Sequence, residues 1–266
     1  WRSYRLNEYT FPDLQGISTD YDRDGFVIVR NVLEAGLVLE LDRHIDWLMD
    51  RHPELQPEGL GHWLIADDPF WVRFLSDPRL LDVAEALVGS HVAFFAADYI
   101  CKQPEKGKGV QWHQDGHYWP LEPMEVMTIW FAVTQSVRAN GCVRMIPGSH
   151  RLGLQKHSSK RDENHILNQV DPAVLDESKA IDIELEPGDI SVHHPLLLHG
   201  SKPNTSTRWR RGGSIQYIPA TTRITRDWPC VFLFRGAPVE GINTYRPFPR
   251  YVEGEHMAFE GCGAWR

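Results

Sequence analysis

The sequence predicts an α+β fold, mainly β: a double-stranded β-helix, or cupin-like jelly roll, with N-terminal helices packed on one sheet. Apolar residues recur at helical spacing in the first third of the chain. From residue 91 onward the spacing changes to the alternation that is typical of strands. Helices that precede a run of about eight strands favour a helical layer on a double-layered antiparallel jelly roll.

The N-terminal third contains two expected helices. Residues 1–20 are polar and are expected to be a loosely held lead-in to a short strand at 26–30. A helix capped by Asn31 follows. Residues 53–75 carry proline, glycine and scattered tryptophan, so we expect mostly loop there. The second helix, at 76–89, has a proline in its first turn and a glycine at its end.

The segments that read as strands cover residues 92–101, 110–115, 126–134, 142–146, 181–185, 190–194 and 211–218, and the segment 181–185 alternates in polarity. Asn140–Gly141 is expected to be a hairpin turn between two of them. The polar, mostly non-periodic residues 151–178 predict a lid-like insertion. Together these features predict one domain over residues 1–266, with a helical part at about 31–90 and a jelly-roll core at about 91–220.

Charge and composition argue against several classes of protein. The net charge of -8 and the lack of a long basic stretch argue against a nucleic-acid partner. Four cysteines lie far apart without a CxxC pair, which favours neither a zinc knuckle nor a disulfide framework and indicates a reducing, cytoplasmic location. No apolar run approaches the roughly 18 residues of a membrane span. Because the chain begins with Trp1, a targeting segment could have been trimmed.

The segment from Val110 to Trp119 contains the pattern that carries the functional prediction. On an extended strand the side chains of His113 and Asp115 point to the same face, because successive side chains alternate. One imidazole and one carboxylate are two of the three ligands of a 2-His-1-carboxylate facial triad. His199 is the candidate third ligand. The open positions of such a triad suit non-heme Fe(II) oxygen chemistry.

A second His-x-Asp pattern is formed by His44, Ile45 and Asp46. It lies in the first predicted helix, where residues two apart do not face each other. We therefore expect His44 and Asp46 to belong to a solvated helix surface and not to a metal site.

Four motifs in order resemble the phytanoyl-CoA dioxygenase family: residues 112–120 (WHQDGHYWP), 140–142 (NGC), 147–150 (PGSH) and 199–201 (HGS), the last followed by Asn204 and Arg210. The resemblance covers roughly residues 20–220. It implies an oxygenase on a double-stranded β-helix that depends on Fe(II), 2-oxoglutarate and O2.

The resemblance also implies roles for single residues. Iron would be bound by His113, Asp115 and His199, and the distal carboxylate of 2-oxoglutarate by Arg210 with help from Ser201 and Trp130. The chemistry of arginine agrees, because its planar fork meets a carboxylate with two parallel hydrogen bonds and keeps its charge when buried.

Neighbouring residues offer alternatives to these assignments. Arg211 should face away from Arg210 on a strand, and Arg208 should belong to the preceding loop, but a solvated arginine cluster is the competing interpretation. His193 and His194 are expected to support the ligands without binding metal, because a proline follows and breaks their strand.

The candidate substrate-binding residues are Lys102, Gln111, His117, Tyr118 and Trp119. The aromatic rings just past the metal ligands are expected to line a pocket, although packing of a loop onto the barrel would use them equally well. Lys102 ends a strand near the same mouth and could pair with an anionic group.

We predict an Fe(II)- and 2-oxoglutarate-dependent dioxygenase that hydroxylates, or oxidatively cyclises, an unactivated C–H bond of a small molecule. A natural product, a sugar-containing metabolite or an acyl-CoA would each fit, the last with Lys156, Lys160 and Arg161 of the insertion near its phosphates. The alternatives are a cupin-like metal isomerase or lyase and a non-catalytic jelly-roll binding module. Sequence leaves the substrate, the choice between hydroxylation and ring formation, and the oligomeric state open.

Overall fold

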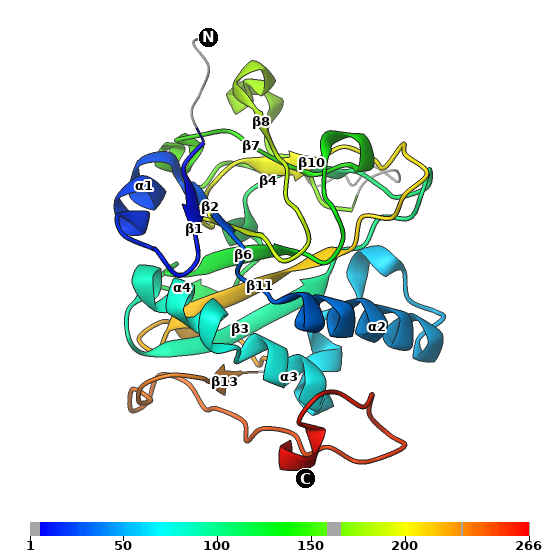
Figure 1. Cartoon of the computed structure of the whole chain (residues 1–266). Coiled ribbons are helices and arrows are strands. Elements are labelled where there is room, and N and C mark those ends of the chain that lie inside the picture. Colours follow the sequence, from blue (N-terminus) through cyan, green and yellow to red (C-terminus); the bar gives the residue numbers. More distant parts are fainter. Residues whose placement is uncertain (1–5, 159–165, 230, 266) are drawn as a thin grey trace.

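Two β-sheets face each other across the centre of the molecule (Figure 1). The computed structural model describes residues 6–158, 166–229 and 231–265. The larger sheet has the order β1 (Glu8–Thr10), β2 (Phe26–Arg30), β9 (Ile190–His193), β6 (Met127–Ala132), β11 (Gly212–Pro219), β3 (Val92–Tyr99) and β13 (Phe232–Leu233). The smaller sheet has the order β4 (Val110–His113), β10 (His199–Ser201), β7 (Val143–Met145) and β8 (Ile181–Ile183). A separate pair joins β5 (Leu121–Glu122) to β12 (Arg223–Ile224).

The larger sheet is buried on both faces, which explains why its strands are almost continuously apolar. Along β6, Ile129 and Phe131 belong to the core on the outer, helical side. Thr128 and Trp130 point the other way and line a cavity between the sheets. Because β11 pairs with both β6 and β3, the same alternation continues across three strands. These strands therefore present one face to the helices and the other to the cavity.

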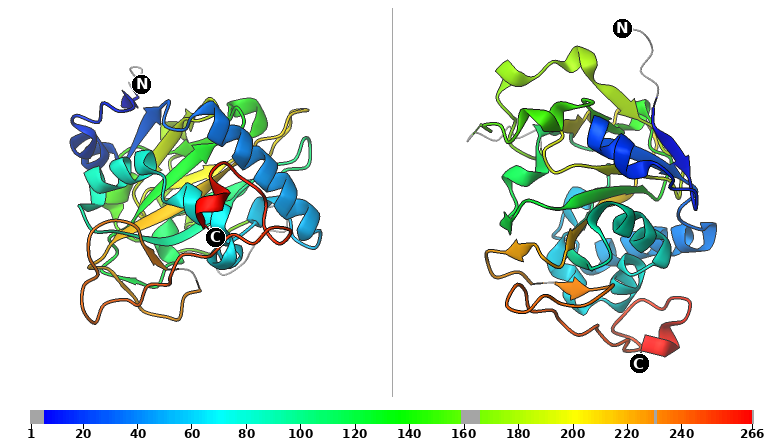
Figure 2. Two further views of the ribbon diagram at one scale, coloured as in Figure 1. Left: turned by 60° about the horizontal axis from the view of Figure 1, so that its bottom comes forward. Right: turned by 90° about the vertical axis from the view of Figure 1, so that its left-hand side faces the viewer.

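Helices cover the outer face of the larger sheet (Figure 2). The predicted jelly roll with N-terminal helices packed on one sheet is confirmed. Helix α4 lies against β3, β6 and β11. The apolar faces of α2 (Ala35–Arg51) and α4 (Pro78–Val88) recur at helical spacing and consist of Leu37, Leu41, Ile45 and Leu48 in α2, and of Leu80, Leu81, Val83 and Ala84 in α4.

Two short helices occur where none was expected. Helix α1 (Ile17–Asp24) begins inside the expected lead-in, and α3 (Pro69–Leu75) lies inside the expected loop at 53–75. The sequence did carry a signal for α3, because Asp68 caps it by accepting the Trp71 N–H and a proline occupies its first position. Both helices are shorter than the window over which helical periodicity can be recognised.

Helix α2 begins at Ala35, so the expected cap at Asn31 was wrong. Asn31 instead adopts the left-handed backbone conformation with φ of 58°. Its N–H donates to Asp189 Oδ1 at 2.9 Å, which ties the end of β2 to the turn before β9. The N-cap position of α2 is Glu34, whose side chain forms no capping hydrogen bond.

The expected hairpin at Asn140–Gly141 was also wrong, because the strands on its two sides belong to different sheets. Asn140 ends the short 3-10 turn η4 (Arg138–Asn140), and Gly141 follows with φ of 80°. The same holds for β8 and β9, which flank the turn at Pro187–Gly188. In both places the chain crosses between sheets, as a jelly roll requires.

The second His-x-Asp pattern is divided between core and surface. His44 is fully buried and bonds through its two ring nitrogens to Asp68 Oδ2 at 2.9 Å and Tyr99 Oη at 3.0 Å, so the expectation of a solvated His44 was wrong. Asp46 is exposed and pairs with Arg211 at 2.7 Å. The two side chains point apart, as expected of residues two apart on a helix.

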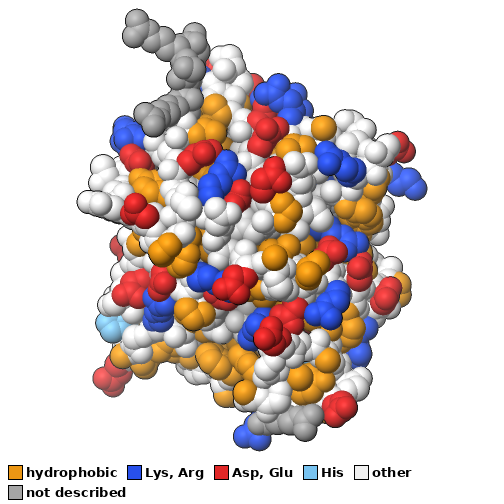
Figure 3. All heavy atoms as spheres, in the orientation of Figure 1, with side chains coloured by type: hydrophobic (Ala, Val, Ile, Leu, Met, Phe, Trp, Pro, Cys, Tyr) orange, Lys and Arg blue, Asp and Glu red, His pale blue; other side chains and the backbone are white. Residues whose placement is uncertain are grey.

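Acidic and basic side chains are interspersed on the face shown in Figure 3. Ion pairs of the described residues include Arg235 with Asp82 at 2.6 Å and with Glu85 at 2.7 Å. Within the described ranges, no helix combines the length and the apolar character that crossing a membrane would require.

Candidate active site

The three candidate metal ligands come from two strands of the smaller sheet and one adjacent turn. His113 ends β4 and His199 begins β10, and the two are direct partners in the antiparallel ladder. Their rings therefore lie side by side, with centroids 4.1 Å apart. Asp115 begins the 3-10 turn η3 (Asp115–His117) and does not continue the strand. The expected position of Asp115 is found, but the expected reason, alternation along a strand, was wrong.

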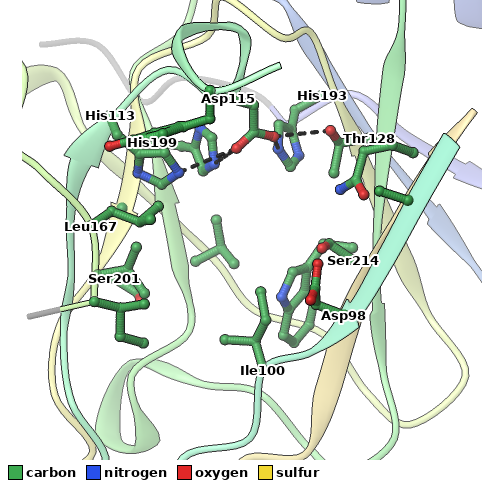
Figure 4. A pocket seen from close by; sticks show the side chains of 18 of the residues that line it. Asp98, Ile100, His113, Asp115, Thr128, Leu167, His193, His199, Ser201 and Ser214 are labelled. Carbon is green, nitrogen blue, oxygen red and sulfur yellow. Dashed lines mark hydrogen bonds and ion pairs between the residues drawn. The ribbon is translucent and has the colours of Figure 1, made fainter. Parts of the chain in front are cut away.

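Hydrogen bonds orient both imidazoles toward the carboxylate (Figure 4). His113 Nδ1 lies 2.7 Å from the Gln111 carbonyl, and His199 Nδ1 lies 3.0 Å from the Leu197 carbonyl. Each Nδ1 must carry the proton to donate there, so each Nε2 keeps a lone pair for a metal. These atoms lie 3.3 Å and 3.5 Å from Asp115 Oδ1. The candidate ligand atoms of the three residues lie within 4.8 Å of one another, a donor set that fits Fe(II).

The second oxygen of Asp115 is held by residues of the larger sheet. Thr128 Oγ1 donates to Asp115 Oδ2 at 3.0 Å, and His193 Nε2 lies 3.2 Å from the same atom. His193 thus supports the carboxylate, in agreement with its expected role. His194 does not line the cavity and packs instead against the ring of His150, at 5.1 Å between centroids.

Burial and the neighbouring histidines have opposite effects on the pKa of Asp115, whereas burial and His113 act in the same direction on the pKa of His199. Burial alone raises the pKa of the Asp115 carboxyl, but His199, His113 and His193 outweigh it and hold that pKa well below the ordinary value. Burial, reinforced by His113, lowers the pKa of His199 well below its ordinary value. An ionised carboxylate beside a neutral imidazole is the protonation state that a metal ion needs.

At the other end of the cavity lies Arg210, which is 1% exposed. Its Nη1 donates to the Gly141 carbonyl at 2.6 Å and its Nη2 to the Ile100 carbonyl at 2.8 Å, while Nε has no partner. The guanidinium lies over the ring of Trp130, 5.2 Å from its centroid. Burial lowers the pKa of Arg210 to about 10. Within the described ranges no carboxylate forms an ion pair with Arg210.

The neighbouring arginines, Arg208 and Arg211, do not line the cavity. Arg208 is exposed. Arg211 points to the helical side of the sheet, where it pairs with Asp42 at 2.8 Å and Asp46 at 2.7 Å. Arg210 alone of the three lines the cavity.

Lys102 is fully buried and does not lie at the mouth, so the expected contact with substrate was wrong. Its Nζ donates to Ser201 Oγ at 2.7 Å and to the Lys202 carbonyl at 2.5 Å. Burial and the nearby Arg210 lower the pKa of Lys102 well below its ordinary value. Lys102 therefore lies behind Ser201, which itself lines the cavity.

The candidate metal ligands and Arg210 line one cavity of about 420 Å³. Tyr118 and Trp119 line it as expected, whereas Gln111 and His117 do not. His117 is exposed and stacks on His157, with ring centroids 4.0 Å apart.

A bulge explains the position of Gln111. His113 pairs with His199 and Val110 pairs with Ser201, so three steps along β4 match two along β10. Val110 and His113 therefore share the cavity face, and Gln111 lies in a shallow pocket on the outer side.

The insertion contributes Ile166 and Leu167 to the cavity wall. The backbone N–H of Asn168 donates to Tyr118 Oη at 3.2 Å, which ties this part of the insertion to the turn after the ligands. Lys156 is exposed and does not line the cavity. Lys160 and Arg161 lie outside the described residues.

The cavity-lining residues that sequence reasoning missed include Asp98, Ser214, Gln216 and Trp228. A signal for three of them was present, because Asp98 on β3 and Ser214 and Gln216 on β11 are polar residues spaced by two in otherwise apolar strands. Trp228 lies in the C-terminal part, where the sequence showed no periodic pattern from which the position of this residue could be predicted.

Comparison with known proteins agrees with this geometry. A family model described as phytanoyl-CoA dioxygenase (PhyH) matches residues 21–212. The human peroxisomal phytanoyl-CoA dioxygenase is 30% identical over 228 residues, which cover 75% of this chain and 67% of the human protein. A probable phytanoyl-CoA dioxygenase of Caenorhabditis elegans is 32% identical over 162 residues, covering 57% of this chain and 52% of that protein. The chain thus spans about half to two-thirds of the length of these relatives.

Solved structures resemble the fold closely. The apo form of the non-heme monooxygenase ThoJ has a TM-score of 0.75 at 23% identity, covering 88% of each chain. The epimerase SnoN, solved with Fe3+, alpha-ketoglutarate and nogalamycin RO, has a TM-score of 0.67 at 24% identity, covering 86% of this chain and 96% of that one. EctD from S. alaskensis with bound Fe has a TM-score of 0.67 at 22% identity, covering 84% and 82%. The predicted fold and the family resemblance over residues 20–220 are confirmed.

Proposed function

This chain belongs to the phytanoyl-CoA dioxygenase family, and on that premise we propose that it is an Fe(II)- and 2-oxoglutarate-dependent dioxygenase. Its reaction is the hydroxylation, or oxidative ring closure, of an unactivated C–H bond of a small molecule. The observation that carries the proposal is one cavity with a complete His-Asp-His donor set at one end and a buried arginine without an acidic partner among the described residues at the other.

His113, Asp115 and His199 would hold the iron. The two imidazoles offer Nε2 lone pairs fixed by backbone carbonyls, and Asp115 offers Oδ1 while Thr128 and His193 hold its other oxygen. Three protein ligands occupy half of an octahedral shell. When bound, Fe(II) with 2-oxoglutarate and O2 supplies the oxidation of the C–H bond, with succinate and CO2 as co-products.

Arg210, Ser201 and Trp130 would bind the distal carboxylate of 2-oxoglutarate. The guanidinium retains N–H groups beyond the two that donate to backbone carbonyls, and it carries an uncompensated charge in a buried position. A carboxylate that meets such a fork forms charge-assisted hydrogen bonds. Trp130 supplies a flat wall, and Lys102 holds the Ser201 hydroxyl in place.

Tyr118, Trp119, Ile166 and Leu167 would enclose the substrate and exclude water from the reacting atoms. We also propose that residues 1–266 act as one domain, because Trp228 of the C-terminal part and Glu58 of the helical part line the same cavity. A cytoplasmic location stays a prediction; the human relative is named as peroxisomal.

The test is succinate release from 2-oxoglutarate by the purified protein in air. Turnover should require both Fe(II) and 2-oxoglutarate, and uncoupled turnover should be detectable without the substrate. A His199→Ala variant is the matched negative control. If iron binds tightly but 2-oxoglutarate is neither bound nor consumed, the metal isomerase or lyase alternative replaces the proposal.

A further inference from the structure

The side-chain amide of Gln114 joins the metal-ligand segment to two other parts of the chain. Gln114 stands between two of the candidate metal ligands, is fully buried and does not line the cavity. Its Nε2 donates to the Gly153 carbonyl at 2.9 Å and to the Leu196 carbonyl at 2.7 Å. Its Oε1 accepts the Gln155 N–H at 2.7 Å. Both donors of the amide and its acceptor therefore bond to backbone groups of other segments.

The segments that Gln114 joins are the loop before the second histidine ligand and the start of the insertion. Leu196 lies three residues before His199. On the insertion side, the backbone N–H of Gln114 also donates to His157 Nε2 at 3.1 Å. His157 Nδ1 lies 3.0 Å from the Gln155 carbonyl and carries the proton, which leaves Nε2 free to accept. Four hydrogen bonds of one buried residue thus hold both segments against the metal ligands.

The insertion extends these contacts to the wall of the cavity. Residues 156–158 pair with residues 169–171 in an antiparallel manner. Ile166 and Leu167 precede the second of these stretches and line the cavity. The Ile166 N–H also donates to the Gly109 carbonyl at 3.2 Å. A contact that holds the first stretch in place therefore also steadies this wall.

Metal binding and the contacts of Gln114 depend on the same backbone. With iron at the triad, the residues on both sides of Gln114 and the start of β10 are fixed. If the amide moved away, two carbonyls and one N–H would lose their partner. Leaving such groups unpaired is costly, so the metal-ligand segment and the insertion favour each other's ordered state. Coupling of this kind is reciprocal, because each partner stabilises the other by the same free energy.

We propose that Gln114 is a positioning residue that couples iron binding at the triad to the packing of the insertion against the cavity. The inference rests on the proposed function, because iron is the ligand that fixes the segment around Gln114. The wall that Ile166 and Leu167 form is then held most firmly when the metal site is filled.

The experiment is hydrogen exchange followed by mass spectrometry, with and without Fe(II) under argon. Peptides that contain residues 153–157 and 166–170 report on the insertion. In the parent protein we expect iron to slow the exchange of these peptides about tenfold. Gln114→Met keeps the length of the side chain but none of its hydrogen bonds. Its insertion should exchange fast with or without iron, and iron should bind about tenfold more weakly.

The matched control is the same substitution within the insertion, Gln155→Met. The side-chain amide of Gln155 donates to the Leu152 and Gly153 carbonyls, which both belong to the insertion. This variant loosens the insertion locally but keeps the hydrogen bonds of Gln114, including the one that Gln114 accepts from the backbone of residue 155. Iron should therefore still slow the exchange.

Iron binding that leaves the exchange of the parent's insertion unchanged overturns the inference. So does an iron effect that both Gln114→Met and the shorter Gln114→Asn retain. Exchange in the strands of the larger sheet reports whether a variant folds, and Gln114→Asn, which keeps an amide at this position, is the test if Gln114→Met does not fold. Succinate release measured in parallel separates the two proposals. Succinate release without an iron effect on exchange rejects only the coupling, whereas an iron effect without 2-oxoglutarate consumption supports the coupling and rejects only the dioxygenase activity.

Discussion

The two ends of the cavity handle buried charge in opposite ways. At the metal end the Asp115 carboxylate lies among three histidines and accepts a hydrogen bond from Thr128. At the other end Arg210 and Lys102 are buried, and the hydrogen bonds that they donate go to neutral carbonyls and a hydroxyl. Neither side chain forms an ion pair with a carboxylate of the described residues.

At the metal end, side chains of the protein compensate the buried charge. At the arginine end, a bound ligand has to compensate it. Uncompensated buried charge costs folding free energy, and a ligand of opposite charge recovers part of it on binding. The metal end should therefore retain its geometry without 2-oxoglutarate. The arginine end should gain the most stability when 2-oxoglutarate binds.

The largest effect is expected from breaking the metal end. Asp115→Ala removes one of three ligands, so the protein should lose its iron and its succinate release should fall to background. Iron content and 2-oxoglutarate turnover are the measurements. The matched control is Asp46→Ala in the second His-x-Asp pattern, which breaks only a surface ion pair and should cost about 0–1 kcal/mol of stability. Normal turnover by Asp115→Ala would show that Asp115 is not a ligand of the catalytic iron.

Breaking the arginine end should affect the ligand and spare the metal. Arg210→Ala should bind iron normally but weaken 2-oxoglutarate binding by about 2–5 kcal/mol, because a charge-assisted partner is lost in a buried site. Titration calorimetry with 2-oxoglutarate measures the loss. Arg208→Ala, at an exposed position, should bind 2-oxoglutarate as the parent does. An equal loss at Arg208 would show that the carboxylate lies elsewhere.

The smallest expected effect is a dependence of folding stability on pH, which arises from Lys102 at the arginine end. Burial and Arg210 lower the pKa of Lys102 in the folded protein, whereas the unfolded chain has the ordinary pKa of about 10.4. Between these values the unfolded state binds the extra proton, so stability should rise with pH across that window. Lys102→Met should remove the rise, about 1.4 kcal/mol for each pH unit inside the window.

Urea unfolding at pH 7 and pH 10 measures this effect. The stability of Lys102→Met relative to the parent should be highest at pH 7 and should decline toward pH 10. Lys106→Met, at an exposed lysine of the same loop, should show no such trend. A constant difference between the parent and Lys102→Met would mean that Lys102 stays charged in the fold.

Local sequence was sufficient for much of the fold and the site. The change of period after residue 91 identified the central strands, and a proline in the first turn with a glycine at the end marked helix α4 within two residues of its bounds. Alternation also separated Arg210 from Arg211, because neighbouring residues on a strand face opposite sides. His113, Asp115 and His199 were recognised through a short spacing and an ordered set of motifs.

Other features depended on partners far along the chain, and only the tertiary structure decided them. A bulge against β10 turns Gln111 outward, Ser201 and the 202 carbonyl draw Lys102 inward, and Asp68 and Tyr99 account for the burial of His44. Periodicity states which face a residue occupies, but not what lies opposite that face. By itself the sequence determined the faces of the strands in the larger sheet and the chemistry of the ligands. Register between distant strands decided which side chains meet, because hydrogen bonds that close long loops have no local pattern.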